Sequence, residues 1–190
     1  MGRHVRRWFR ATAATAAVLA AATVGLVAPA SAAGAHQIGG SAYVVAVSDG
    51  VNPAWTDDCP EPDGYEDFSF LTIELVEGNL QGCWYTLVEE YRFSPNADAS
   101  PVVYQERGRE VFVGDLYDDA GNLMGEGTFE TTYKFTGKYE DASLFVEIHG
   151  RCQHPIVDGT GTGVFAGMRG RVDFKDNVET GELTYRGHLK

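Results

Sequence analysis

From Phe68 to the end of the chain, apolar and polar residues alternate with a period of two over most of the sequence. The clearest case is the segment 127–137, in which one face carries Phe129, Thr131, Tyr133 and Phe135. Successive side chains of a strand point to opposite faces, so each such run predicts a β-strand with one apolar face. The segments between these runs have no helical periodicity of useful length, and the sequence therefore predicts an all-β domain.

Turn residues divide the alternating runs into eight or nine strands. The expected strands are 41–47, 71–76, 80–93, 102–106, 110–117, 127–137, 143–151, 170–176 and 183–189, after a flexible lead-in at 33–40. In 143–151 the residues predicted to face inward are Leu144, Val146 and Ile148. Regular spacing and hairpin turns favour a closed antiparallel barrel of about eight strands, since closure removes exposed strand edges. A β-sandwich is the alternative.

The first 32 residues have the features of a signal peptide. Four arginines precede an alanine-rich apolar stretch, and residues 30–32 form an A-x-A-like cleavage site. The pair Arg6 and Arg7 also resembles a twin-arginine signal, with the general secretory route as the alternative. We expect cleavage after Ala32 and a single secreted domain over residues 33–190, without a membrane anchor.

The exported part is strongly acidic. Removing residues 1–32 takes away four of the 15 basic residues and none of the 27 acidic ones, which leaves a net charge of −16. Such a charge disfavours binding to nucleic acid and to anionic membranes. Many acids lie in the segment 49–67, which contains three prolines and is expected to form a long loop. No feature of the sequence indicates an oligomeric state.

All three cysteines lie in the exported part, where a disulfide can persist. Cys83 and Cys152 share strand parity with apolar neighbours, so a Cys83–Cys152 disulfide between two inward-facing residues is the preferred prediction. The alternative is a Cys59–Cys83 disulfide, which would attach the acidic loop to the barrel. The sequence has no C-x-x-C or paired histidine spacing, so it predicts no metal site. The acidic segment 118–122 is interpreted as a turn and not as a calcium loop.

A glycine-rich segment precedes the last two strands. Its glycines are Gly159, Gly161, Gly163, Gly167 and Gly170. Glycine at this density indicates positive φ angles or close approach of the backbone to a neighbour, so the segment is predicted to be a structural corner. Phosphate binding is not favoured, because the Gly-Lys-Ser/Thr sequence is absent and a strand follows where a helix would be needed.

The run from Gly159 to Gly170, GTGTGVFAGMRG, resembles the G-[ST]-G-x-F-x-G-x-x-G signature of allene oxide cyclase-like and dirigent-like barrels. The segments 150–156, 172–175 and 185–189 are similar to those of a group of uncharacterised bacterial secreted proteins. The resemblance implies a barrel that holds an apolar substrate in a shaped lumen. It covers the glycine corner and the number of strands, and the catalytic residues of the family do not map onto this chain.

Candidate catalytic and binding residues are few. Glu147, His149 and Arg151 alternate on one strand and could bind or protonate an anion, but a solvent-facing row is the favoured interpretation because the opposite face is apolar. His154 and His188, near strand ends, could each line a barrel mouth. The sequence lacks the G-x-S-x-G motif and the Ser/His/Asp order of a standard hydrolase.

Two functions remain open from the sequence. The first is a secreted barrel that binds a small apolar molecule in its lumen, with cofactor-free isomerase or cyclase activity as an extension. The second is a non-catalytic interaction module with a filled barrel and an active outer loop. An eight-stranded barrel is just wide enough to be filled by side chains or to hold one small ligand. We favour binding over catalysis, and we expect no cofactor.

Overall fold

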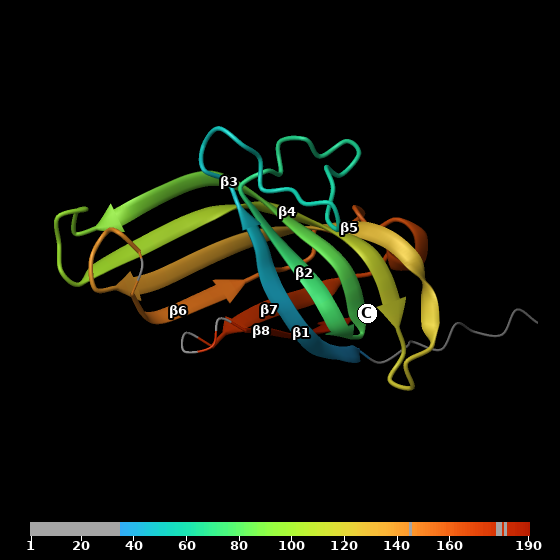
Figure 1. Ribbon diagram of the computed structural model, residues 1–190. Helices are drawn as coiled ribbons and strands as arrows, with labels where there is room; N and C mark the ends of the chain where they lie inside the picture. Colours follow the sequence, from blue (N-terminus) through green and yellow to red (C-terminus); the bar gives the residue numbers. More distant parts are fainter. Residues whose placement is uncertain (1–34, 145, 178–179, 181) are drawn as a thin grey trace, which may run out of the picture. The chain divides into compact units, whose positions relative to one another are not determined.

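The computed structural model describes residues 35–190, except for 145, 178, 179 and 181. The predicted signal peptide, residues 1–32, lies outside the described residues. The elements, labelled in Figure 1, are β1 (His36–Val47), β2 (Leu71–Gly78), β3 (Leu80–Ser94), β4 (Val102–Tyr117), β5 (Leu123–Tyr139), β6 (Glu147–Gln153), a short 3-10 helix η1 (Gly163–Phe165), β7 (Gly170–Asp176) and β8 (Leu183–Leu189).

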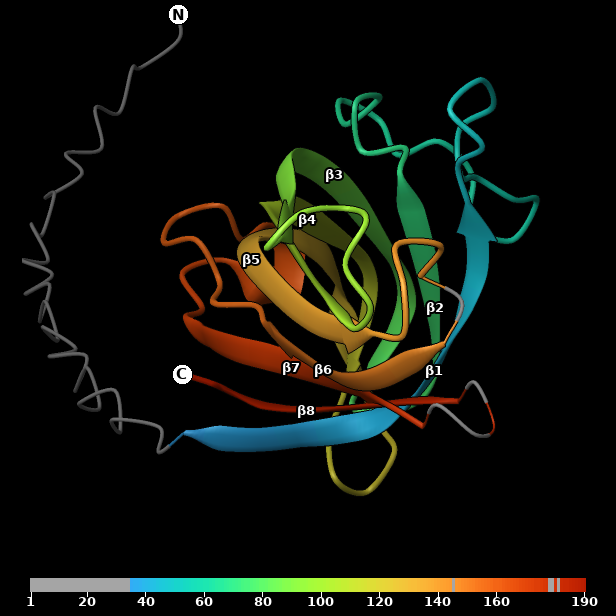
Figure 2. The same cartoon turned by 90° about the vertical axis from the view of Figure 1, so that its left-hand side faces the viewer.

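The eight strands form one antiparallel sheet that curls into a nearly closed barrel. The order is β6-β5-β4-β3-β2-β1-β8-β7, and Figure 2 shows the strands arranged in a ring. The residues that follow β6 close the gap to β7. The Val172 amide donates to the His154 carbonyl at 3.1 Å, and the Ile156 amide donates to the Gly170 carbonyl at 3.0 Å. The predicted all-β barrel is confirmed.

Several strand predictions differ from the structure, among them the expected strand 143–151, since β6 begins at Glu147. β1 begins at His36 and not at Ser41, because His36 to Gly40 pair with β8, so the predicted flexible lead-in at 33–40 is wrong over these residues. The expected strands 102–106 and 110–117 are one strand, β4. Gly108 looks like a turn residue in the sequence, yet it pairs with Val88 and allows the close approach of the Leu87 carbonyl.

Aromatic residues fill one end of the lumen. Trp84, Phe112 and Phe129 are paired side by side across β3, β4 and β5 and are fully buried. Phe165, from η1, lies on top of them, with its ring centroid 5.1 Å from that of Phe129. The glycine corner makes this possible, because Gly163 has a φ of 53° and a side chain there would clash with the Glu126 carbonyl. Figure 1 shows the corner at the end of the barrel opposite the loop 95–101.

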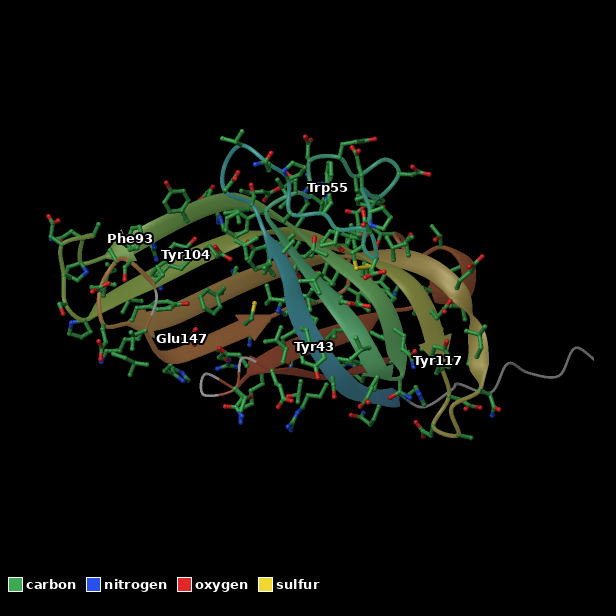
Figure 3. The ribbon with its side chains drawn as sticks, viewed as in Figure 1. Tyr43, Trp55, Phe93, Tyr104, Tyr117 and Glu147 are labelled. Atoms are coloured by element: carbon green, nitrogen blue, oxygen red, sulfur yellow. A yellow bond between two sulfur atoms is a disulfide. The ribbon has the colours of Figure 1, made fainter. Side chains whose placement is uncertain are left out.

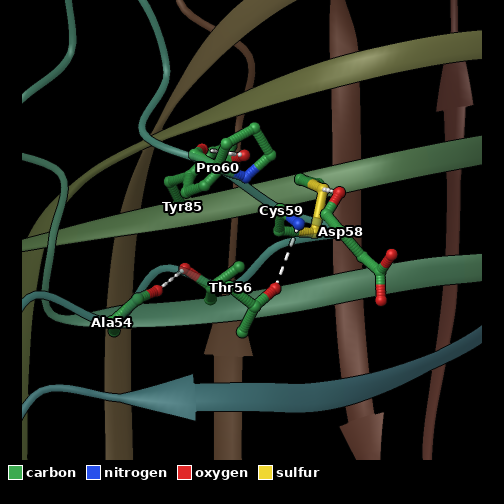
Figure 4. Close-up of a disulfide and its surroundings, with 8 residues drawn as sticks. Ala54, Thr56, Asp58, Cys59, Pro60 and Tyr85 are labelled. Atoms are coloured by element: carbon green, nitrogen blue, oxygen red, sulfur yellow. Dashed lines mark hydrogen bonds between the residues drawn. A yellow bond between two sulfur atoms is a disulfide. The ribbon is translucent and has the colours of Figure 1, made fainter.

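A second apolar cluster lies on the outer surface of the barrel, beneath the loop 48–70. Cys59 and Phe68 from this loop pack against Tyr85 and Val111 on the outward faces of β3 and β4. A Cys59–Cys83 disulfide fixes the loop there, and the Tyr85 hydroxyl donates to the Pro60 carbonyl at 2.7 Å (Figure 4).

The preferred Cys83–Cys152 disulfide is therefore wrong, and the structure contains the alternative. Cys83 points outward to the loop, whereas Cys152 is a free cysteine among the residues that line the lumen. A disulfide is compatible with an extracellular location. Within the described part of the chain, no helix is long and apolar enough to cross a membrane.

Candidate functional site

The lumen contains a cavity of about 370 Å³ beyond the aromatic end. Its apolar wall includes Ile73, Phe135, Phe174 and Leu183, from four different strands. The cavity extends toward the turn between β5 and β6, where Tyr139 and Leu144 also line it. A volume of this size lies within the range of small-molecule sites.

A deeply buried polar group in the cavity is the carboxylate of Glu110, which is 3% exposed. It accepts hydrogen bonds from the hydroxyls of Thr86, at 3.2 Å, and Thr131, at 3.0 Å. The three side chains lie side by side because Thr86 and Thr131 pair with Glu110 in the register of β3 and β5. Neighbouring residues in a sheet point to the same face, so the ladder directs all three into the lumen.

His154 completes this buried network. Its Nδ1 lies 2.5 Å from Oε2 of Glu110, and the residue is 2% exposed. The Tyr133 ring stacks on the imidazole at an interplanar angle of 15°, and the rings of Trp84 and Phe174 meet it edge-on. The imidazole is therefore held by one carboxylate and three aromatic rings.

The second imidazole nitrogen, Nε2, is buried and has no hydrogen-bond partner among the described residues. When Nδ1–H donates to the carboxylate, a neutral imidazole carries its lone pair on Nε2. A carboxylate on one nitrogen fixes the orientation and tautomer of a histidine and makes the other nitrogen a proton acceptor. The arrangement can thus accept a hydrogen bond or a proton from a bound molecule that reaches Nε2.

Glu106 lies two residues from Gly108 on the same inward face of β4. It accepts hydrogen bonds from the hydroxyls of Tyr104, at 2.5 Å, and Tyr133, at 3.2 Å. Burial raises the pKa of Glu106, although the two tyrosine hydrogen bonds oppose this shift. Burial and the charge of Glu106 also raise the pKa of Tyr133, so this hydroxyl remains a hydrogen-bond donor.

Glu147 is half-buried at the first residue of β6. Tyr139 donates to its Oε2 at 3.1 Å, while Oε1 is buried without a partner in the part of the chain that the structure describes. Burial raises the pKa of Glu147, and the nearby negative charge of Asp176 adds to this effect. Figure 3 shows Glu147 and Tyr104 toward the same end of the barrel.

The free thiol of Cys152 also lines the cavity. Burial raises its pKa far above the ordinary value, and the negative charge of Glu110 contributes. Since the thiolate is the nucleophilic form of cysteine, this residue is not an activated nucleophile.

The prediction that Glu147, His149 and Arg151 all face solvent is correct for two of the three residues. His149 and Arg151 are exposed, as predicted, but Glu147 faces the cavity. The prediction that Val146 and Ile148 face inward is wrong, because they are 50% and 51% exposed. A register shift opposite Lys138 and Tyr139 reverses the side-chain alternation at this point of β6.

The sequence did not identify Glu110 as a site residue, nor its contact with His154. His154 was placed near a barrel mouth but lies deep in the lumen, where its backbone bonds to β7. One signal was present. Glu110 shares strand parity with the apolar Phe112, and threonines stand at the positions that pair with it. His188, the other histidine considered, does not line the cavity.

Within the described ranges, no group of three or more His, Cys, Asp or Glu side chains has the arrangement of a metal site. The glycine corner packs against β5, where Thr162 Oγ1 accepts from the Thr128 amide at 3.0 Å, and contributes no residue to the cavity. Comparisons with protein families, with characterised proteins and with solved structures find no match to this chain.

Proposed function

We propose that this protein binds one small, largely apolar molecule in the lumen of its barrel. The observation that carries the proposal is the cavity of about 370 Å³, which combines an aromatic and aliphatic wall with a few buried polar groups. Ligand sites commonly have this composition, in which apolar walls supply affinity and a few polar groups fix orientation. A barrel of the allene oxide cyclase-like type is part of the proposal, on the strength of the glycine signature.

The alternative, an interaction module with a filled barrel and an active outer loop, has less support. The loop 48–70 packs on the barrel through the disulfide and the apolar cluster around Phe68. It therefore has a structural role that accounts for its cysteine and its aromatic residues.

We also propose that the protein is exported and acts outside the cell. The basic n-region, the apolar stretch and the cleavage site before Ala33 support export, and the disulfide is compatible with it. N-terminal sequencing of protein from the culture medium of its producer should give Ala33 as the first residue. A chain that retains Met1 and stays inside the cell contradicts the proposal.

Native mass spectrometry of protein purified from its producer tests the ligand proposal. We expect an additional mass that disappears on denaturation. The Cys152→Phe and Leu183→Phe variants, which place bulk in the lumen, should lose that mass while keeping a folded circular dichroism spectrum. Ile148→Phe is the matched control, because Ile148 lies on β6 but is 51% exposed. A bare protein that also fails to bind apolar probes overturns the proposal.

A further inference from the structure

The cavity is rich in hydrogen-bond acceptors and negative charge. Four acids line it, namely Glu106, Glu110, Glu147 and Asp176. Among the described lining residues Arg151 is the one Lys or Arg, and it is exposed. The interior therefore presents carboxylates without a buried Lys or Arg to neutralise them, which disfavours an anionic ligand and favours a cationic one.

Two buried acceptor atoms in this cavity have no donor among the described residues. They are Oε1 of Glu147 and, in the tautomer that donates to Glu110, Nε2 of His154. Buried polar atoms are nearly always hydrogen-bonded in folded proteins, so each unpartnered acceptor is a point at which a donor of a bound molecule would gain a hydrogen bond. A ligand that carries N–H groups satisfies this requirement, whereas a ketone, an ether or a carboxylate does not.

The walls of the cavity suit a cation as well. Six phenylalanine and tyrosine rings line it, those of Phe70, Tyr104, Tyr133, Phe135, Tyr139 and Phe174. The faces of aromatic rings attract ammonium groups and at the same time offer apolar surface to a hydrocarbon chain or ring. The combination of carboxylates with aromatic rings is a common way to bind an organic cation.

The surroundings of Glu147 make it the best anchor for the ammonium group. Tyr139 of β5 donates to one of its oxygens, Asp176 of β7 lies near enough to influence its ionisation, and His149 on its own strand acts to lower its pKa. Burial raises the pKa of Glu147, and the charge of Asp176 raises it further. A bound cation favours the ionised carboxylate and therefore lowers the pKa of Glu147, against the effects of burial and of Asp176. Binding of the ammonium group and ionisation of Glu147 thus favour each other.

We propose that the ligand is a protonated amine with an apolar body, held with its ammonium group at Glu147 and its body between the aromatic walls. This inference rests on the proposed function and narrows it to a chemical class. Related molecules of the same length that carry a hydroxyl or a carboxylate should bind more weakly, because the first supplies fewer donors and no charge and the second is repelled by the acids.

Isothermal titration calorimetry with octylamine, octanol and octanoate, which share one hydrocarbon chain, tests the inference. At neutral pH we expect octylamine to bind at least about tenfold more tightly than octanol, and octanoate to bind most weakly. Glu147→Gln should remove most of the preference for octylamine over octanol. Glu140→Gln, which removes an exposed acid at the same end of the barrel, is the matched control and should bind like the unmodified protein.

The pH dependence provides a second readout. Octylamine affinity should rise as the pH passes through the raised pKa of Glu147, since the amine stays protonated at acidic and neutral pH, while octanol affinity stays flat. Octanol binding equal to or tighter than octylamine binding overturns the amine inference and leaves lumen binding intact. Failure of all three probes to bind overturns both the inference and the proposed function.

Discussion

Nδ1 of His154 lies 2.5 Å from Oε2 of Glu110, and the two residues, 44 positions apart in the sequence, are both almost completely buried. Glu110 is on β4, and His154 follows β6 at the point where the barrel closes onto β7. The contact thus connects the polar centre of the lumen to the closure of the barrel. Its removal should affect stability as well as ligand binding.

Glu110→Ala and His154→Ala should each lower the free energy of unfolding by about 3 kcal/mol, because each leaves a buried polar partner unsatisfied. The double variant should be about 1–3 kcal/mol more stable than the sum of the two effects predicts. Urea denaturation of the four proteins measures this coupling. Glu110→Ala combined with His149→Ala, at an exposed histidine, should be additive. Additivity in the Glu110 and His154 cycle as well contradicts a direct interaction.

The disulfide should connect the outer loop to β3 and leave one thiol in the lumen. A non-reducing peptide map should contain a Cys59 peptide joined to a Cys83 peptide, with Cys152 free. In the folded protein Cys152 should react with iodoacetamide at pH 8 at least about 100-fold more slowly than in urea, because it is buried and its pKa is raised.

Loss of the disulfide should destabilise the fold. Cys59 and Cys83 are 24 residues apart, so replacing both with alanine should cost about 3 kcal/mol in the chain-entropy account. Cys152→Ala should retain the joined peptides. A Cys83–Cys152 peptide in the map would contradict the structure.

Alanine substitutions at two positions of the glycine corner distinguish the energetic cost of backbone strain from that of a steric clash. Gly159 and Gly163 both have positive φ, at 82° and 53°. A β-carbon at Gly159 meets nothing within 4 Å, whereas one at Gly163 would clash with the Glu126 carbonyl. Gly159→Ala should therefore cost about 1 kcal/mol, and Gly163→Ala about 3 kcal/mol, in urea denaturation. Equal costs would mean that η1 does not pack against β5 as the structure shows.

Glu106 and Glu147 should make the protein less stable as the pH rises. Both carboxyl groups have a raised pKa in the folded protein, mainly because of burial. They hold their protons more tightly when folded, so the stability they contribute is complete below the ordinary pKa of 4.5 and is lost as the pH rises through the raised values.

Replacing both glutamates with glutamine should flatten this part of the pH profile. Urea denaturation between about pH 4 and about pH 8, with the ligand removed, compares the double variant with Glu140→Gln as the control. The difference in unfolding free energy between the double variant and the unmodified protein should increase with pH. A difference that decreases with pH would show that the tyrosine hydrogen bonds outweigh burial.

The alternation of apolar and polar residues was sufficient to predict most of the strands and to favour a closed barrel over a sandwich. It placed Phe129, Thr131, Tyr133 and Phe135 together on one face of β5, and all four face the interior of the barrel. Local pattern is informative here because the side-chain period of a strand is fixed by backbone geometry. The glycine run likewise indicated a corner, since positive φ is a local property.

The site could not be predicted, because it depends on which residues meet across the barrel. Both faces of β3 are buried, with Trp84 and Thr86 in the lumen and Cys83 and Tyr85 under the loop 48–70. An alternation of apolar and polar residues with a period of two does not distinguish the inner face of a barrel from an outer face that a loop covers. This ambiguity led to the wrong disulfide prediction. A single register shift placed Glu147 inside and Ile148 outside. The sequence alone determined most of the strands and favoured their closure into a barrel. Only closure of the barrel, which joins distant segments, decided that Glu110 and His154 meet in the lumen.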